Sequence, residues 1–213
     1  EEHRSRILLL DLRDKWNNLE ICVANAHLEG DPRQPMARVS QVKSALQEAS
    51  RRGGPSAHAL VLAGDLNAPL ISSAVASYLS FGAVLPGVSE FGMLVDAERE
   101  MSRESGHPYS MTSAYAPDAM EFSFTLRGSA GQCHMLDQIW FDSTRCQCQA
   151  LRNLFRSEEH KMAVLGHGLP NLEDPSDHLP IGVILKIGAS VSEPAGPQGL
   201  PSTSEVKELR EED

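Results

Sequence analysis

A carboxylate and a carboxamide follow an apolar run near the middle of the chain. Residues 60–63 read Leu-Val-Leu-Ala, which is typical of a strand buried on both faces, and Gly64, Asp65 and Asn67 come shortly after it. If strand geometry continued, Asp65 and Asn67 would point to the same side, at the carboxyl end of a buried strand, where α/β sheets usually bind ligands. Asp65 could accept a proton or hold a metal, and Asn67 could donate to an oxyanion. The competing interpretation is a strand-ending turn, since Gly, Asp and Asn all favour turns.

Three further segments carry polar side chains at the ends of expected strands. Asn25 and His27 end one strand, Asp137 interrupts an apolar stretch, and Asp177 and His178 precede the last strand. A buried carboxylate is unfavourable without a partner, and His178 could supply one, because an Asp fixes the charge or tautomer of an imidazole. Taken singly, His27, Asp137 and Asp177 each have a structural explanation, as a surface histidine, an ion pair and a turn former. Their occurrence together, in this order, favours a catalytic site.

The elements expected around these residues alternate between strands and helices. Strands are expected at 6–12, 19–28, 60–63, 121–127, 135–141, 146–154 and 180–187, helices at 36–52, 75–81 and near 93–101, and loops through most of 82–115 and through the segment that carries His160 and His167. Turn residues at 14–18 predict that the first two strands form an antiparallel hairpin. Because the helices lie between strands without strict alternation, the pattern predicts an α/β (α+β) layered sandwich.

Composition narrows the classes of protein. The chain has 213 residues and a formal charge of −10, of which six acids and two bases at 188–213 contribute −4. This balance disfavours salt-driven binding of long duplex nucleic acid but allows a nucleotide or a short single strand. The Pro-, Gly- and Ser-rich 188–213 is expected to be a disordered acidic tail.

The cysteines and the hydropathy indicate a setting for the chain. The four cysteines fit no zinc spacing and are interpreted as reduced packing residues: Cys22, Cys133, Cys146 and Cys148. No apolar run is long enough to span a membrane. The expected setting is therefore intracellular, most simply the cytoplasm, with room for an organellar leader ahead of Glu1.

Five short motifs in order resemble a known family. They are Asn-Ala-His-Leu at 25–28, Arg-Val-Ser-Gln at 38–41, Gly-Asp-Leu-Asn at 64–67, Leu-Asp-Gln-Ile-Trp-Phe at 136–141 and Pro-Ser-Asp-His-Leu-Pro at 175–180. In this order they resemble the exonuclease–endonuclease–phosphatase superfamily, and within it the carbon catabolite repressor-type deadenylases and nocturnin-like proteins. The resemblance covers roughly residues 6–187. It implies a two-sheet β-sandwich flanked by helices, the four-layer nuclease/phosphatase fold.

The resemblance also implies the chemistry, which is Mg²⁺-dependent phosphoester hydrolysis, with Mn²⁺ as an alternative ion. The implied catalytic residues are Asp65 for the attacking water, Asn67 for the phosphoryl oxygens, His178 for the charged transition state, Asp137 to orient His178, and His27 on the scissile phosphate. Asp177 and Asp65 would lie at the metal. The implied substrate-binding residues are Asn25, Phe124 and Arg127, the last two by stacking and charge.

Departures from the family pattern qualify these expectations. The family's metal-binding glutamate lies in N-terminal strands that have no counterpart here, Ala26 replaces a threonine, and Gln138 replaces a tyrosine. We therefore expect residues 1–187 to be the C-terminal portion of such a domain, with an incomplete metal site, little activity by itself and an uncovered sheet edge.

Two functions from different classes remain. The first is a 3′–5′ exoribonuclease or phosphatase-like hydrolase, whose substrate is the 3′ end of single-stranded RNA such as poly(A), or a nucleotide. The alternative is a non-catalytic pseudoenzyme that binds a nucleotide or a protein. Neither a membrane nor a particular protein partner is indicated by the sequence.

Overall fold

The computed structural model describes residues 7–53, 58–94, 106–115, 126–127 and 133–188. Its strands are β1 (Ile7–Arg13), β2 (Glu20–His27), β3 (His58–Asp65), β4 (Met111–Ser113), β5 (Leu126–Arg127), β6 (Cys133–His134), β7 (Asp137–Asp142), β8 (Cys146–Leu151) and β9 (Val183–Ile187). Its helices are α1 (Pro35–Arg52), α2 (Ala74–Phe81), α4 (Glu158–His167) and the 3₁₀ helix η1 (Ser89–Met93).

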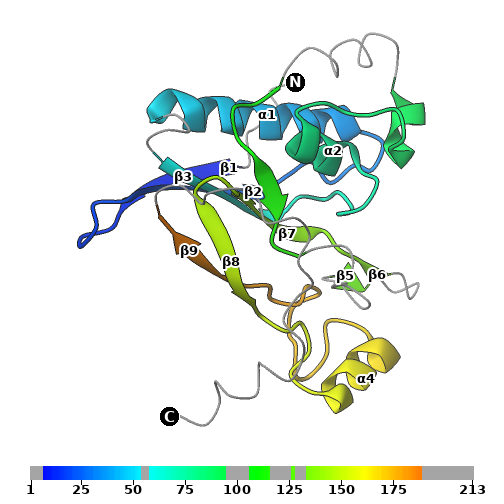
Figure 1. Ribbon diagram of the computed structural model, residues 1–213. Coiled ribbons are helices and arrows are strands. Elements are labelled where there is room, and N and C mark those ends of the chain that lie inside the picture. Colours follow the sequence, from blue (N-terminus) through cyan, green and yellow to red (C-terminus); the bar gives the residue numbers. More distant parts are fainter. Residues whose placement is uncertain (1–6, 54–57, 95–105, 116–125, 128–132, 189–213) are drawn as a thin grey trace.

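The main sheet has five strands in the order β1-β2-β3-β7-β4 (Figure 1). Strands β1 and β2 form the expected antiparallel hairpin, β2 and β3 run parallel, and β7 is antiparallel to both of its neighbours. The side chain of Asp14 shapes the hairpin turn by accepting hydrogen bonds from the Trp16 N–H at 2.9 Å and from Asn17 Nδ2 at 3.0 Å. The sheet is therefore mixed, and its middle strands carry the site segments.

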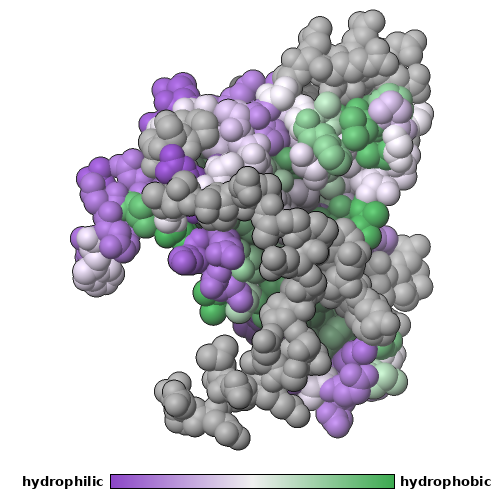
Figure 2. Space-filling view, in the orientation of Figure 1, coloured by the Kyte–Doolittle hydropathy of each residue, from purple (hydrophilic) through white to green (hydrophobic). Residues whose placement is uncertain are grey.

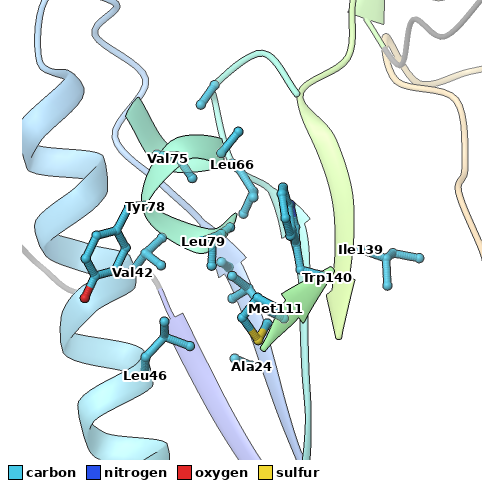
Figure 3. Close-up of a cluster of buried hydrophobic side chains, with 14 of the residues drawn as sticks. Ala24, Val42, Leu46, Leu66, Val75, Tyr78, Leu79, Met111, Ile139 and Trp140 are labelled. Atoms are coloured by element: carbon cyan, nitrogen blue, oxygen red, sulfur yellow. The ribbon is translucent and has the colours of Figure 1, made fainter. Parts of the chain in front are cut away.

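Helices α1 and α2 cover one face of this sheet (Figure 1). Val39, Val42 and Leu46 of α1 recur at helical spacing and are buried against the sheet. Helix α2 begins at Ser73, whose side chain accepts a hydrogen bond from the Ala76 N–H, and contributes its buried residues to the same core. In Figure 3, Trp140 points from β7 toward α2, whereas Ile139 leaves the strand on the other side.

The other face of the sheet packs against β8 and β9, which form a two-stranded antiparallel sheet. Val183, Leu185 and Ile187 of β9 are partly buried against the core. The structure thus has the α/β layers that the sequence predicts, and in the described part of the chain β5 and β6 form a further two-stranded sheet. The domain boundary at residue 187 stays a prediction.

Strand β1 leaves apolar side chains exposed at the sheet edge. Leu8, Leu10 and Leu12 are 56%, 44% and 50% exposed. Figure 2 shows hydrophobic surface among hydrophilic groups on this hairpin. These exposures show that one face of β1 lacks cover among the described residues, and the uncovered sheet edge stays a prediction.

Two sequence predictions are wrong in the described part of the chain. The segment from Glu158 to His167 is helix α4, not a loop: Ser157 accepts a hydrogen bond from the His160 N–H, and two acidic residues lie in the first turn. Only His160 and Val164 of α4 are buried, so the helix needs few apolar residues. Its sequence therefore lacks the amphipathic pattern from which a helix is predicted. Strand β4 also lies where only loops and a helix were expected, as a short edge strand beside β7.

Other expectations fall on residues outside the description. The helix expected near 93–101 overlaps only the end of η1, the strand at 121–127 is described only as β5, and most of the acidic tail, 189–213, is not described. Among the helices that the structure describes, none is long and apolar enough to cross a membrane.

Candidate active site

The site lies where the carboxyl ends of β2 and β3 meet the start of β7. In the strand register His27 is opposite Asp65, and Asp65 is opposite Asp137. Three segments that are far apart in the sequence therefore place polar side chains side by side at one end of the main sheet. This is the end at which open α/β sheets bind ligands.

Strand β3 can approach β2 only because residue 64 is glycine. Gly64 has a φ of 131°, and a Cβ at this position would lie 2.0 Å from the backbone oxygen of Ala26. An L-residue rarely adopts that φ, and no side-chain rotamer relieves a clash with backbone. The glycine therefore sets the position of Asp65 beside β2.

Asp65 and Asn67 lie in a turn rather than in a continuing strand. Strand β3 ends at Asp65, and Asn67 has a left-handed φ of 47°. The Asn67 N–H donates to Asp65 Oδ1 at 2.9 Å, and Asn67 Nδ2 donates to the Leu28 backbone oxygen at 3.0 Å. Of the two interpretations of this stretch, the structure shows the strand-ending turn, which Asn67 can adopt because Asn tolerates the left-handed region. The turn nevertheless keeps both residues next to β2.

His178 and Asp137 form a close pair beside Asp65. His178 Nδ1 and Asp137 Oδ2 are 2.6 Å apart. A carboxylate only accepts, so we assign the donated proton to Nδ1, which leaves Nε2 to face a substrate. Burial lowers the pKa of His178, but the hydrogen bond that its Nδ1 donates to Asp137 and the charges of Asp137, Asp65 and Asp177 outweigh burial and raise the pKa above its ordinary value. The site therefore favours an imidazolium.

Asp65, Asp137 and His178 are also the one group of side chains, among the described residues, that could hold a metal ion. Their ligand atoms lie within 4.8 Å of one another. Mg²⁺ prefers oxygen ligands and keeps several waters, so one carboxylate with water and a substrate phosphate is a reasonable set. Asp65 fits that role, whereas Asp137 is already bonded to His178. Asp177 is exposed and outside this group, although its charge raises the pKa of His178.

His27 and Asn25 face solvent on the other side of Asp65. The His27 side chain is 63% exposed, and its Nε2 lies 3.8 Å from Asp65 Oδ2. Both residues line a pocket of about 390 Å³ together with Ile7, Leu8 and Asp65. An exposed imidazole at a carboxylate is well placed to meet an incoming anionic group.

The Arg-Val-Ser-Gln motif at 38–41 lies on α1 and has a positional role that the sequence did not reveal. Arg38 is 1% exposed, donates to the backbone oxygen of Asp31 at 2.7 Å and pairs with Glu90 at 2.7 Å. Gln41 accepts a hydrogen bond from the Glu29 N–H at 3.0 Å. Both side chains thus hold the loop that follows His27. The signal that the sequence offered for this role was an arginine among the apolar positions of an amphipathic helix.

The remaining predicted residues are not placed by the structure. Phe124 lies outside the described residues, and the side chain of Arg127 is not described, so their substrate contacts stay predictions.

Two histidines outside the site form hydrogen bonds within the fold. His107 Nε2 lies 3.0 Å from the backbone oxygens of Tyr78 and Leu79, at the end of α2. His160 of α4 pairs with Asp174 at 2.7 Å. Neither belongs to the group at Asp65.

The sequence is similar to that of a curated protein. No protein-family model matches the chain. The probable CCR4-Not complex 3′-5′-exoribonuclease subunit Ccr4 of Encephalitozoon cuniculi is 26% identical over 181 residues, which is 84% of this chain and 34% of that protein. The chain thus spans about a third of this relative.

Solved structures share the fold. The human nocturnin catalytic domain with bound sulfate matches with a TM-score of 0.56 at 18% identity, over 85% of this chain and 53% of that one. ANGEL2, a 2′,3′-cyclic phosphatase, in complex with adenosine-2′,3′-vanadate, matches with a TM-score of 0.58 at 20% identity, over 86% and 68%. The chain therefore shares its fold with these structures, and with an endonuclease/exonuclease/phosphatase of Bacteroides vulgatus that matches with a TM-score of 0.52 at 14% identity, over 84% and 54%. Its sequence is similar to that of a probable 3′-5′-exoribonuclease subunit.

Proposed function

We propose that this chain carries the catalytic residues of a divalent-metal-dependent phosphoester hydrolase of the deadenylase or nocturnin type. The observation that carries the proposal is the Asp137–His178 pair beside Asp65, at the ends of three strands or loops. Such a site suits phosphoryl transfer, which depends on positioning and on charge stabilisation more than on covalent catalysis. The similarity to a probable exoribonuclease subunit supports the same reaction class.

Each side chain has a step that its geometry allows. The raised pKa of His178 favours its cationic form, in which Nε2–H can donate to the phosphoryl oxygens as negative charge develops. Asp65 Oδ1 is fixed by the Asn67 N–H, which orients the carboxylate toward an attacking water. Asn67 Nδ2 donates one of its two hydrogens to the Leu28 backbone oxygen, which leaves the second hydrogen for a phosphoryl oxygen. His27 is exposed for contact with the scissile phosphate.

A hard cation would be held chiefly by the Asp65 carboxylate, with Asp177 as the second proposed ligand. Bound there, Mg²⁺ or Mn²⁺ would neutralise phosphate charge and lower the pKa of a bound water. The sequence expectation that a further glutamate completes this site remains part of the proposal.

We propose as substrate the 3′ end of a single-stranded RNA such as poly(A), or a nucleotide. The superfamily fold accommodates both, since the probable Ccr4 subunit is named an exoribonuclease and ANGEL2 a 2′,3′-cyclic phosphatase. The expected intracellular setting stays a prediction, which the free Cys22, Cys146 and Cys148 support.

The experiment measures Mg²⁺-dependent hydrolysis of oligo(A), NADP⁺ and RNA ending in a 2′,3′-cyclic phosphate. It compares the chain with a longer polypeptide that includes any residues encoded before Glu1. The Asp65→Ala and His178→Ala variants serve as controls. We expect activity that both substitutions abolish, greatest in the longer form.

The alternative is a binding protein that does not hydrolyse its ligand. It is favoured by the commitment of Asp137 to His178, which leaves Asp65 as the main carboxylate for a metal. Well-folded protein that binds a nucleotide but hydrolyses none of the three substrates in either form would support this function and overturn the hydrolase.

A further inference from the structure

Gln138 is buried beside the site residue Asp137 but faces the opposite side of β7. It is 1% exposed. Its Nε2 donates to the backbone oxygen of Ala68 at 2.6 Å and to that of Met135 at 3.3 Å, and its Oε1 accepts from Trp140 Nε1 at 2.8 Å. Both amide hydrogens and the carbonyl therefore have partners. A buried network with every member bonded fixes its surroundings strongly.

The group that Gln138 holds most closely is the end of the site turn. Ala68 directly follows Asn67, whose backbone is in the left-handed region. At the start of the turn, the Leu66 N–H donates to the backbone oxygen of Leu136 at 2.9 Å, one residue before Asp137. The turn of residues 65–68 is thus tied to β7 at both of its ends, and Gln138 supplies the second tie.

We infer that Gln138 is a positioning residue of the proposed hydrolase. Through Ala68 it holds Asp65 and Asn67 at a fixed distance from the Asp137–His178 pair. Catalytic groups must stay close to the reactive geometry, and a displacement of about 1 Å can reduce a rate about a hundredfold. The catalytic part of this inference rests on the proposed function. The structural part, in which Gln138 ties the turn to β7, is independent of it.

The competing explanation is that Gln138 only stabilises the core. Two substitutions separate the explanations. Gln138→Met keeps the approximate volume and removes all three hydrogen bonds. Trp140→Phe is the matched control, because it removes the bond to Gln138 Oε1 and leaves the bond to Ala68 in place. Both variants lose stability, but only Gln138→Met releases the turn.

The first readout is amide hydrogen exchange, which requires no activity. The Leu66 and Asn67 amides report on the turn, and the Ala24 amide in β2 reports on the sheet. We expect Gln138→Met to lower protection of the turn amides relative to Ala24 about tenfold or more, and Trp140→Phe to leave this ratio within about twofold. An equal fall of the ratio in both variants, or no fall in either, would overturn the inference.

The second readout is steady-state kinetics on whichever substrate the wild-type protein hydrolyses. Gln138→Met should lower kcat about 10- to 100-fold with KM within about threefold, while Trp140→Phe keeps kcat near wild type. A kcat that Gln138→Met leaves unchanged would overturn the positioning role. If neither the chain nor its longer form hydrolyses a substrate, the proposed function fails, and the exchange ratio still decides whether Gln138 holds the turn. Gln138→Leu repeats the test if Gln138→Met does not fold.

Discussion

His178 and Asp137 are 41 residues apart in the chain, yet His178 Nδ1 lies 2.6 Å from Asp137 Oδ2. Asp137 begins β7, in the main sheet, whereas His178 lies in the loop that follows α4 and precedes β9. The contact therefore joins the loop to the end of the sheet. It also favours the cationic form of His178 next to Asp65, where a phosphoryl group would carry negative charge in the proposed hydrolase.

The first prediction concerns the charge of His178 in the metal-free protein. Its pKa is raised above the ordinary histidine value, because the carboxylates of Asp137, Asp65 and Asp177 outweigh the effect of burial. Stabilisation from the charged pair is thus complete below the ordinary pKa and is lost as the pH rises through the raised one. An NMR titration of the His178 ring should show a midpoint above that of a histidine in the unfolded chain.

The control for this titration is the second His–Asp pair. Asp137→Asn should bring the pKa of His178 down, since burial then acts with less opposition. Asp174→Asn removes the partner of His160, in the α4 region, and should leave the His178 midpoint in place. A His178 midpoint that ignores Asp137→Asn would contradict the assigned pairing.

The second prediction concerns the bend in β3. Gly64→Ala should destabilise the fold by about 2–4 kcal/mol, because its Cβ would overlap the backbone oxygen of Ala26 at an unfavourable φ. Thermal or urea unfolding measures the loss. Gly87→Ala is the matched control, since a Cβ there meets nothing within 4 Å. Equal stability of the two variants would show that β2 and β3 do not approach this closely.

Much of the fold is readable from periodicity, as at β2, α1 and β3. The hairpin follows from Asp14 and Asn18, and α1 from apolar residues at helical spacing. Gly64, Asp65 and Asn67 favoured both a turn and a site, and the structure shows a turn that places site residues together. The two interpretations compete in the sequence because the same small polar residues serve both.

What the sequence could not reveal depends on contacts distant along the chain. Gln138 looked like a substitution in a motif, and only folding brings Ala68 to its side chain. Helix α4 has few buried residues, so its apolar pattern is weak, and its local signals were the capping residue Ser157 and the acidic residues of its first turn. The short strand β4 is defined by its pairing with β7, which no local pattern encodes.

The third prediction concerns the buried ion pair behind the site loop. Arg38 is almost wholly buried, and Glu90 both pairs with it and accepts from the Ala74 N–H at 2.6 Å, at the start of α2. Arg38→Met should destabilise the protein by about 3–5 kcal/mol, because it leaves a carboxylate with little solvent. The measurement is urea unfolding of Arg38→Met, Glu90→Gln and the double variant.

These three variants form a double-mutant cycle, which separates the Arg38–Glu90 interaction energy from the effect of each substitution on its surroundings. We expect a coupling energy of about 1–3 kcal/mol between Arg38 and Glu90, since the guanidinium and the carboxylate are in contact and shielded from water. The exposed pair of Arg51 and Glu48 on α1 is the control, and its removal should change stability little. Additive effects at Arg38 and Glu90 would contradict a direct interaction.

The last prediction concerns two buried thiols. Burial raises the pKa of Cys22 to about 11, with a smaller contribution from Asp11, and burial raises the pKa of Cys146 to about 11 with help from the charge of Asp142. At pH 8 only about a thousandth of each thiol is then the reactive thiolate. Iodoacetamide followed by peptide mass spectrometry should label both residues slowly in the folded protein and rapidly in urea. Cys148, which is partly exposed, should react sooner. Labelling of Cys22 in the native state as fast as of Cys148 would show that β2 opens from α1 far more readily than its packing implies.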